Sequence, residues 1–208
     1  NKGRRQFLKG AALAGAGYWA AGGVSLAQSD AANERIRFAC IGIGGKGGSD
    51  SGDAARHSDV GAICDTGKQR LKGAQGRYSK AKANTDYRQL FKEMGKEIDA
   101  VTVSTPDHNH APATMLALKS GKHAFTQKPL THSIYEARML GNVARENKLA
   151  TQMGNQGTSN SNLRKSAAII QSGALGKVTE VHVWTNPPVW PRGGDRPGEQ
   201  PIPGFLDW

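Results

Sequence analysis

The residues with the clearest chemical meaning are three glycines that are spaced as G-x-G-x-x-G within residues 42–47. The first glycine of such a motif permits a tight turn, the second lets the backbone approach a pyrophosphate, and the third lets a helix pack closely on a strand. A helix that starts here would offer N–H groups and the positive end of its dipole to phosphate. The spacing therefore predicts a dinucleotide-binding loop. Its members are Gly42, Ile43, Gly44, Gly45, Lys46 and Gly47.

An acidic residue follows at the distance that such a site needs. Asp65 stands 23 residues after Gly42 and ends the apolar run of residues 60–64. A carboxylate at the end of a second strand can accept hydrogen bonds from a ribose diol. Its charge would repel a 2′-phosphate, so Asp65 favours NAD as the cofactor. Lys68 and Arg70 follow closely, however, and leave NADP open.

The glycine motif needs its context, because a chain with 27 glycines can match it by chance. Residues 36–41 read as a strand, residues 49–56 as a helix, and residues 60–64 as a second strand. These three supports favour a dinucleotide-binding unit over the alternative, which is a glycine-rich surface loop.

Strand and helix patterns alternate along most of the chain. Further strands are expected at residues 99–104, 123–126 and 149–153, and further helices at residues 66–78, 87–94, 111–119, 134–147 and 162–172. Residues 80–85 read as a polar loop, and residues 178–185 alternate like a half-exposed antiparallel strand. This order predicts an α/β fold with a doubly wound parallel sheet, the Rossmann arrangement. Ligands bind beyond the carboxyl ends of such strands, so the polar segments that follow them should form one active edge.

Residues 1–27 have the pattern of an export signal. The stretch GRRQFLK at residues 3–9 is basic, residues 10–26 are weakly apolar, and small residues close the segment. The paired arginines resemble a twin-arginine signal, which predicts a periplasmic or otherwise exported protein. Such export carries folded proteins with bound cofactors, so this signal and the dinucleotide motif support each other. A membrane anchor or an amphipathic helix is the alternative, although the run is short for a bilayer span.

Composition narrows the class of partner. Residues 1–27 hold four of the 28 Lys and Arg residues and none of the 17 Asp and Glu residues, so the remainder carries 24 basic and 17 acidic side chains, a net charge of +7. This surplus is scattered, and we expect no nucleic-acid binding and no membrane association after signal removal. Cys40 and Cys64 lie near the ends of the first two strands. Buried free thiols are expected, with a disulfide as the alternative in an oxidising compartment.

Three motifs in order carry a family resemblance. They are GIGGKG at residues 42–47, STPDHNH at residues 104–110 and QKPL at residues 127–130. Together they resemble the glucose–fructose oxidoreductase / inositol dehydrogenase / rhizopine catabolism (Gfo/Idh/MocA) family of nicotinamide-dependent oxidoreductases, over about residues 36–185. The segments QKPL and WTNP, the latter at residues 184–187, are similar to the sequences of the secreted branch that carries twin-arginine signals.

The resemblance implies roles for individual residues. Lys128 would lie beside the nicotinamide as the catalytic residue that hydrogen-bonds a substrate hydroxyl and helps move its proton. The alternative is a solvated lysine beside a proline turn. Gln127 stands where many members have a glutamate. Further cofactor-lining positions implied by the resemblance are Ser104, Thr105, Pro106, His110, Gln127, Lys128 and Asn155, with Gln156 nearby.

A metal cluster of Asp107, His108 and His110 is a weaker alternative, because the spacing is loose and a third ligand is not evident. We therefore expect no metal at this segment.

Family enzymes continue into an α+β domain that supplies most substrate contacts and the oligomer interface. Here we expect only its start, so that residues 34–157 form the Rossmann domain and residues 158–208 form the beginning of the substrate domain with a proline-rich arm, as in a truncated chain. The first hypothesis is an exported NAD(P)-dependent oxidoreductase, a potential homo-oligomer, acting on a CH–OH group of a sugar or polyol; some relatives use the same oxidation to cleave or rearrange sugars. A non-catalytic dinucleotide-binding fragment and a cell-surface binding module are the alternatives.

Overall fold

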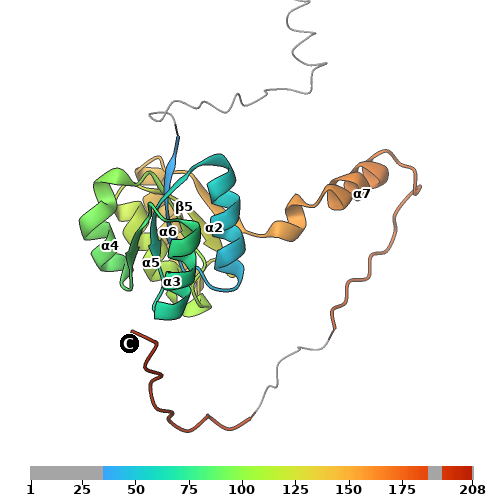
Figure 1. Cartoon of the computed structure of the whole chain (residues 1–208). Helices are drawn as coiled ribbons and strands as arrows, with labels where there is room; N and C mark the ends of the chain where they lie inside the picture. Colours follow the sequence, from blue (N-terminus) through green and yellow to red (C-terminus); the bar gives the residue numbers. More distant parts are fainter. Residues whose placement is uncertain (1–34, 187–193, 208) are drawn as a thin grey trace, which may run out of the picture. The chain divides into compact units, whose positions relative to one another are not determined.

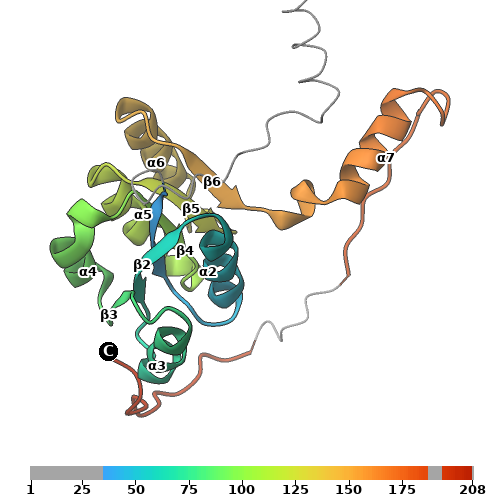
Figure 2. The same cartoon turned by 45° about the horizontal axis from the view of Figure 1, so that its top comes forward.

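A parallel sheet forms the centre of the computed structural model, which describes residues 35–186 and 194–207. Its strands are β1 (Arg37–Ile41), β2 (Asp59–Cys64), β3 (Lys82–Asn84), β4 (Ala100–Val103), β5 (His123–Gln127) and β6 (Thr151–Gly154). Their spatial order is β3-β2-β1-β4-β5-β6, and each neighbouring pair runs parallel (Figures 1 and 2). This order reverses beside β1, as in a doubly wound dinucleotide-binding sheet. The Rossmann fold predicted from the sequence is confirmed.

Helices cover both faces of this sheet (Figure 1). Helices α2 (Lys46–His57) and α3 (Lys68–Arg77) lie on one face, where Leu71 packs with Ile43 and Ile63. Helices α4 (Tyr87–Met94), α5 (His110–Lys119) and α6 (Ile134–Glu146) lie on the other, over a larger apolar cluster. This division follows from the right-handed crossovers that connect parallel strands.

The first two strands are buried on both faces, which explains their continuous apolar sequences. Along β1, Ala39 and Ile41 pack toward α4, α5 and α6, whereas Cys40 packs toward α2 and α3. Cys64 on β2 faces the same side as Ile41. The two cysteines therefore project from opposite faces of the sheet. Both are buried and free, which confirms the prediction of buried free thiols.

Local signals define several helix ends. Asp86 caps α4 by accepting a hydrogen bond from the Arg88 N–H at 2.8 Å. Ser133 and Glu136 form a capping box at the start of α6. Gly121, with a φ of +73°, ends the turn after α5. These boundaries agree with the predicted helices to within a few residues, and α7 (Ser161–Gln171) also forms where a helix was predicted.

Two expectations were wrong. The predicted loop of residues 80–85 contains strand β3, because the backbone from Lys82 to Asn84 pairs with the free edge of β2 in spite of its polar side chains. Residues 178–185 form no strand and are exposed, since no neighbouring strand is present among residues 35–186 and 194–207 to accept their backbone hydrogen bonds. The predicted export signal, residues 1–27, and part of the proline-rich arm, residues 187–193, lie outside the described residues.

Among residues 35–186 and 194–207, no helix has the length and apolar character to cross a bilayer.

Candidate functional site

The first corner of the site is the turn that connects β1 to α2. Gly42 has a φ of +78°, which favours glycine, and a Cβ at this position would lie 2.6 Å from the carbonyl carbon of Ser104. A Cβ on Gly47 would lie 1.9 Å from the carbonyl oxygen of Gly42. Neither position has room for a side chain. The turn therefore needs the first and third glycines for the reasons that the motif suggested.

The middle of this turn forms a cradle that fits a pyrophosphate. Helix α2 begins at Lys46 after Gly45, which has a φ of +52° and provides no side-chain cap. A Cβ on Gly44 would lie 2.8 Å from Cδ of Arg70, so the Arg70 side chain lies over this glycine. Because that side chain is 66% exposed, it can move aside for an anion or pair with it. The uncapped helix start and the nearby guanidinium both favour negative charge.

Asp65 lies beside this turn at the end of β2, and its side chain is 7% exposed. Its Oδ2 accepts a hydrogen bond from the Ile43 N–H at 3.1 Å, and its Oδ1 accepts one from the Gly67 N–H at 2.8 Å. The Arg70 guanidinium lies 3.9 Å from Oδ1. A carboxylate has about four acceptor directions, so capacity remains for a ribose hydroxyl. The contact of Asp65 with a ribose stays a prediction.

The second corner comprises the segments after β4 and β5, and the segment after β4 contains the predicted residues Ser104, Thr105 and Pro106. The Ser104 N–H donates to the carbonyl of Ile41 at 2.8 Å, which fixes this segment against β1. Thr105 Oγ1 is buried and has no hydrogen-bond partner among the described residues. A buried hydroxyl normally has a partner, so this unpaired atom agrees with a ligand at the edge of the sheet, and the cofactor contact of Thr105 stays a prediction. Pro106 precedes a short 3-10 turn, η2 (Asp107–Asn109).

The ring of His110 connects two loops instead of facing an open space. It is 1% exposed, with Nδ1 at 2.6 Å from the carbonyl oxygen of Pro129 and Nε2 at 2.8 Å from that of Thr105. The ring thereby ties the segment after β4 to the segment after β5. Its direct contact with a cofactor stays a prediction, and the engagement of both nitrogens favours an indirect role.

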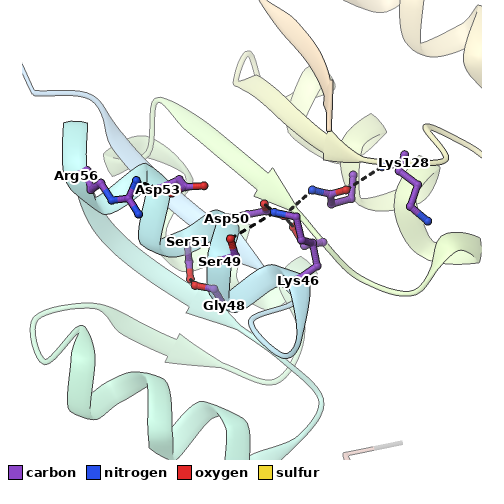
Figure 3. A network of polar contacts seen from close by, with 10 residues as sticks. Lys46, Gly48, Ser49, Asp50, Ser51, Asp53, Arg56 and Lys128 are labelled. Carbon is purple, nitrogen blue, oxygen red and sulfur yellow. Dashed lines mark hydrogen bonds and ion pairs between the residues drawn. The ribbon is translucent and has the colours of Figure 1, made fainter. Parts of the chain in front are cut away.

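Asp50 in α2 is a residue that the sequence motifs do not identify, and it joins the two corners (Figure 3). Its side chain is 4% exposed and forms an ion pair with Lys46. It also accepts hydrogen bonds from Ser104 Oγ at 2.7 Å and from Gln127 Nε2 at 2.9 Å. The available signal in the sequence is that Asp50 stands four residues after Lys46, which places both on one face of a helix.

Lys128 lies at the end of this network. Its backbone N–H donates to Oε1 of the buried Gln127 side chain at 3.2 Å. The Lys128 side chain is exposed and extends away from Asp50 (Figure 3), and the following peptide bond to Pro129 is cis. Lys128 therefore carries an exposed ammonium group at the carboxyl end of β5. Its backbone is held by the hydrogen bond to the buried Gln127 side chain.

The segment after β6 contributes the last predicted positions. With its amide oxygen turned toward the network, Gln156 accepts from Lys46 Nζ at 3.1 Å and from Gln127 Nε2 at 2.7 Å, and its nitrogen donates to the Gly154 carbonyl at 3.0 Å. Gln156 thus belongs to the same cluster. Asn155 is exposed, and only its backbone is engaged, with its carbonyl accepting from Thr158 Oγ1 at 2.6 Å. Its cofactor contact stays a prediction.

Within the described parts of the chain, no group of three or more His, Cys, Asp or Glu residues is placed to hold a metal ion. Asp107 and His108 are exposed on η2, whereas His110 points into the protein.

Comparisons with known proteins agree with this geometry. The model of an oxidoreductase family with an NAD-binding Rossmann fold, GFO_IDH_MocA, matches residues 36–155. A glycosyl hydrolase family 109 protein from Solibacter usitatus is 32% identical over 157 residues, which cover 68% of this chain and 36% of that protein. An inositol 2-dehydrogenase from Salmonella typhimurium is 27% identical over 126 residues, which cover 60% of this chain and 37% of that protein.

Among solved structures, the myo-inositol 2-dehydrogenase from Lactobacillus plantarum is similar, with a TM-score of 0.65 and 22% identity over 70% of this chain and 43% of that one. This likeness shows the fold. The chain spans little more than a third of the length of the curated relatives that it matches.

Proposed function

This chain belongs to the Gfo/Idh/MocA family of NAD-binding oxidoreductases, and from that premise we propose that it supports hydride transfer to or from a hydroxyl of a sugar or polyol. The observation that carries the proposal is the position of three features on one parallel sheet. The glycine turn follows β1, Asp65 follows β2, and Lys128 follows β5. In a doubly wound sheet these carboxyl ends share one edge, where ligands bind.

The residues at this edge divide the work of binding. The turn at residues 42–47 and the start of α2 would hold the pyrophosphate, and Asp65 would hold the adenosine ribose. Asp65 favours NAD over NADP because its charge opposes a 2′-phosphate, while Arg70 at 3.9 Å reduces that preference. A bound nicotinamide coenzyme supplies the hydride chemistry of the reaction.

Lys128 is the residue that we propose acts on the substrate. Its exposed ammonium group can hydrogen-bond a substrate hydroxyl, and the amine can take up or return the hydroxyl proton as the carbon is oxidised or reduced. The backbone of Lys128 is fixed by Gln127 and by the contact between the Pro129 carbonyl and His110. A fixed backbone limits the positions that the ammonium group can reach, which favours orientation of the substrate.

The similarity to an inositol 2-dehydrogenase supports a polyol as the substrate class. The similarity to a glycosyl hydrolase family 109 protein supports a variant in which a sugar is oxidised transiently and cleaved. A panel of polyols and glycosides, assayed with the whole protein and NAD, distinguishes the two. Net formation of NADH indicates oxidation, and release of the sugar's leaving group without net NADH indicates cleavage.

A second candidate function is dinucleotide binding without catalysis. It is supported by the family model that matches residues 36–155, because its description names only an NAD-binding Rossmann fold for that part of the chain. This candidate predicts coenzyme binding with no turnover of any sugar or polyol.

The direct test of the proposal is a fluorescence titration of the purified chain with NADH and, separately, with NADPH. We expect saturable NADH binding within the range of about 1 μM to 1 mM that is usual for enzyme ligands. NADPH should bind more weakly. Failure of both coenzymes to bind would overturn the proposed function and its second candidate together.

We also propose that the protein is exported through its twin-arginine segment. The support is the basic stretch with Arg4 and Arg5 ahead of a weakly apolar run. Cell fractionation of the Arg4→Lys, Arg5→Lys double variant checks this: the variant should stay in the cytoplasm while the unchanged protein is exported. Equal export of both would contradict the proposal.

A further inference from the structure

A buried carboxylate lies where the two corners of the site meet. Asp50 accepts hydrogen bonds from Ser104 and Gln127 and pairs with Lys46 (Figure 3). These partners come from three places: the segment after β4, the end of β5 and the first turn of α2. Nothing in the binding of a dinucleotide requires a carboxylate in the second turn of the phosphate-binding helix. Its contacts therefore need a separate explanation.

The amide of Gln127 passes the constraint on to Lys128. Its nitrogen donates to Asp50 Oδ2 at 2.9 Å, and its oxygen accepts from the Lys128 N–H at 3.2 Å. An amide has a donor at one end and an acceptor at the other, so it can connect a carboxylate to a backbone N–H. The Gln127 side chain is buried, which leaves it little freedom to exchange these partners for water.

The chemistry of this pair depends on charge. A carboxyl group in place of the Gln127 amide would put two carboxylates at hydrogen-bond distance, and both cannot ionise there without strong repulsion. Lys46 is the charged group that faces Asp50 from its own helix, and Lys128 projects away from it. The hydrogen bond between the side chains of residues 50 and 127 is therefore favourable when the two side chains carry one negative charge in total.

We propose that Asp50 is a positioning residue for Lys128, which it holds in place through the Gln127 amide while pairing with Lys46 of the phosphate-binding turn. This inference rests on the proposed function for the role of Lys128. In this role Asp50 acts through Gln127 and Lys46. It connects the corner that binds the coenzyme to the corner that acts on the substrate.

The experiment measures hydrogen exchange of the Lys128 backbone amide by NMR in the full chain, expressed as a protection factor. In the Asp50→Ala variant Gln127 loses the buried carboxylate that accepts from its amide nitrogen and keeps the exposed Gln156 as an acceptor. We expect protection of the Lys128 amide to fall about tenfold, the factor for loss of one hydrogen bond. Asp53→Ala is the matched control. Asp53 lies on the same helix, is 56% exposed and pairs only at the surface with Arg56, so protection of Lys128 should stay within about twofold.

A second arm of the experiment changes the charge of residue 127 and does not depend on the Asp50→Ala variant. In Gln127→Glu, the introduced carboxyl can donate to Asp50 while the two groups share a proton, so Lys128 should be protected at about pH 5 and lose about tenfold in protection at about pH 8. Adding Asp50→Asn to Gln127→Glu restores one negative charge and one amide. Protection in this double variant should return to within about threefold of the unchanged protein at both pH values.

The outcomes are distinct. Equal protection of Lys128 in the Asp50→Ala and Asp53→Ala variants, or no recovery in the double variant, would overturn the positioning role of Asp50. The proposed function is judged separately by NADH titration of the unchanged chain, which does not involve these variants.

Discussion

The two corners of the site are built from different kinds of contact. The turn at residues 42–47 is fixed by its backbone, since Gly42 and Gly47 lie too close to other main-chain atoms to carry a side chain. The corner around Lys128 is fixed by side chains, through Gln127, Asp50 and His110. The first corner includes the start of α2, which has no side-chain cap, and the second includes the exposed side chain of Lys128.

This difference matches the task that we propose for each corner. A pyrophosphate is the same in every dinucleotide, so a rigid backbone cradle suits it. A substrate hydroxyl must be met by one group at one position, and a buried side-chain network can tune that position without changing the fold. The contrast predicts that changes at Lys128 affect the reaction and spare the fold, whereas changes at the glycines affect both.

The largest effect is expected from Lys128→Ala. Removal of the group that we propose moves the substrate proton should lower kcat by about 10²- to 10⁴-fold in the whole protein. Because the side chain is exposed, the free energy of unfolding should change by no more than about 0.5 kcal/mol. Steady-state assays on a responsive polyol and urea unfolding measure the two quantities.

Lys119→Ala is the control for this prediction, because Lys119 is an exposed lysine at the end of α5, away from the QKPL segment. It should change neither quantity. Equal kcat in Lys128→Ala and the unchanged protein would remove Lys128 from the catalytic role and leave the second corner without its proposed function.

The next largest effect is expected from Gly47→Ala. The new Cβ would lie 1.9 Å from the Gly42 carbonyl oxygen, so the turn must move. We expect the free energy of unfolding to fall by about 1–3 kcal/mol and NADH affinity to fall by about tenfold or more. Gly52→Ala on the same helix has nothing within 4 Å of its Cβ and should stabilise the protein by up to about 1 kcal/mol. Similar behaviour of the two variants would contradict the backbone description of this corner.

The sequence could predict the first corner because its constraint is local. Six consecutive residues after an apolar run carry the information, and the structure places Gly42 and Gly47 where a side chain has no room, as the motif requires. The order of strands and helices was also predictable, since parallel strands buried on both faces read as continuous apolar runs. Strand β3 was not predicted, because it forms through backbone pairing with β2 and its side chains lack the apolar pattern of a strand.

The second corner could be predicted only in part. The resemblance pointed to Lys128, but the hydrogen bonds of Asp50 reach residues 54 and 77 positions away, and no local pattern reveals such contacts. Arg70 is similar: its place over Gly44 follows from the packing of α3 beside the turn. The expected strand at residues 178–185 failed for a related reason, because alternation alone cannot supply a partner strand.

A smaller effect is expected at the edge of the first corner, where Asp65 and Arg70 lie 3.9 Å apart. In Asp65→Asn the charge that repels a 2′-phosphate is lost, so the preference for NADH over NADPH should narrow by about tenfold, equivalent to about 1.4 kcal/mol. Arg70→Ala should act in the opposite direction by weakening NADPH alone. Parallel titrations of both coenzymes measure the ratios. A shift of the same sign in both variants would refute this division of roles.

The smallest effect concerns the strands that carry the first corner. Burial raises the pKa of the Cys40 thiol to about 11 and that of Cys64 to about 12, from an ordinary value of 9.0. The unfolded chain therefore loses these protons first, so the stability contributed by the neutral thiols is complete below about pH 9 and declines as pH rises toward 11 and 12. Between pH 8 and pH 9.5 we expect a loss of about 0.5–1 kcal/mol per thiol, measured by urea unfolding. Cys64→Ala should remove about half of this dependence of the unfolding free energy on pH.

Burial also raises the pKa of Tyr87 above 10.0, so ionisation of the tyrosine adds little to this dependence below pH 9.5. An unchanged slope in Cys64→Ala would show that other groups govern alkaline unfolding of these strands.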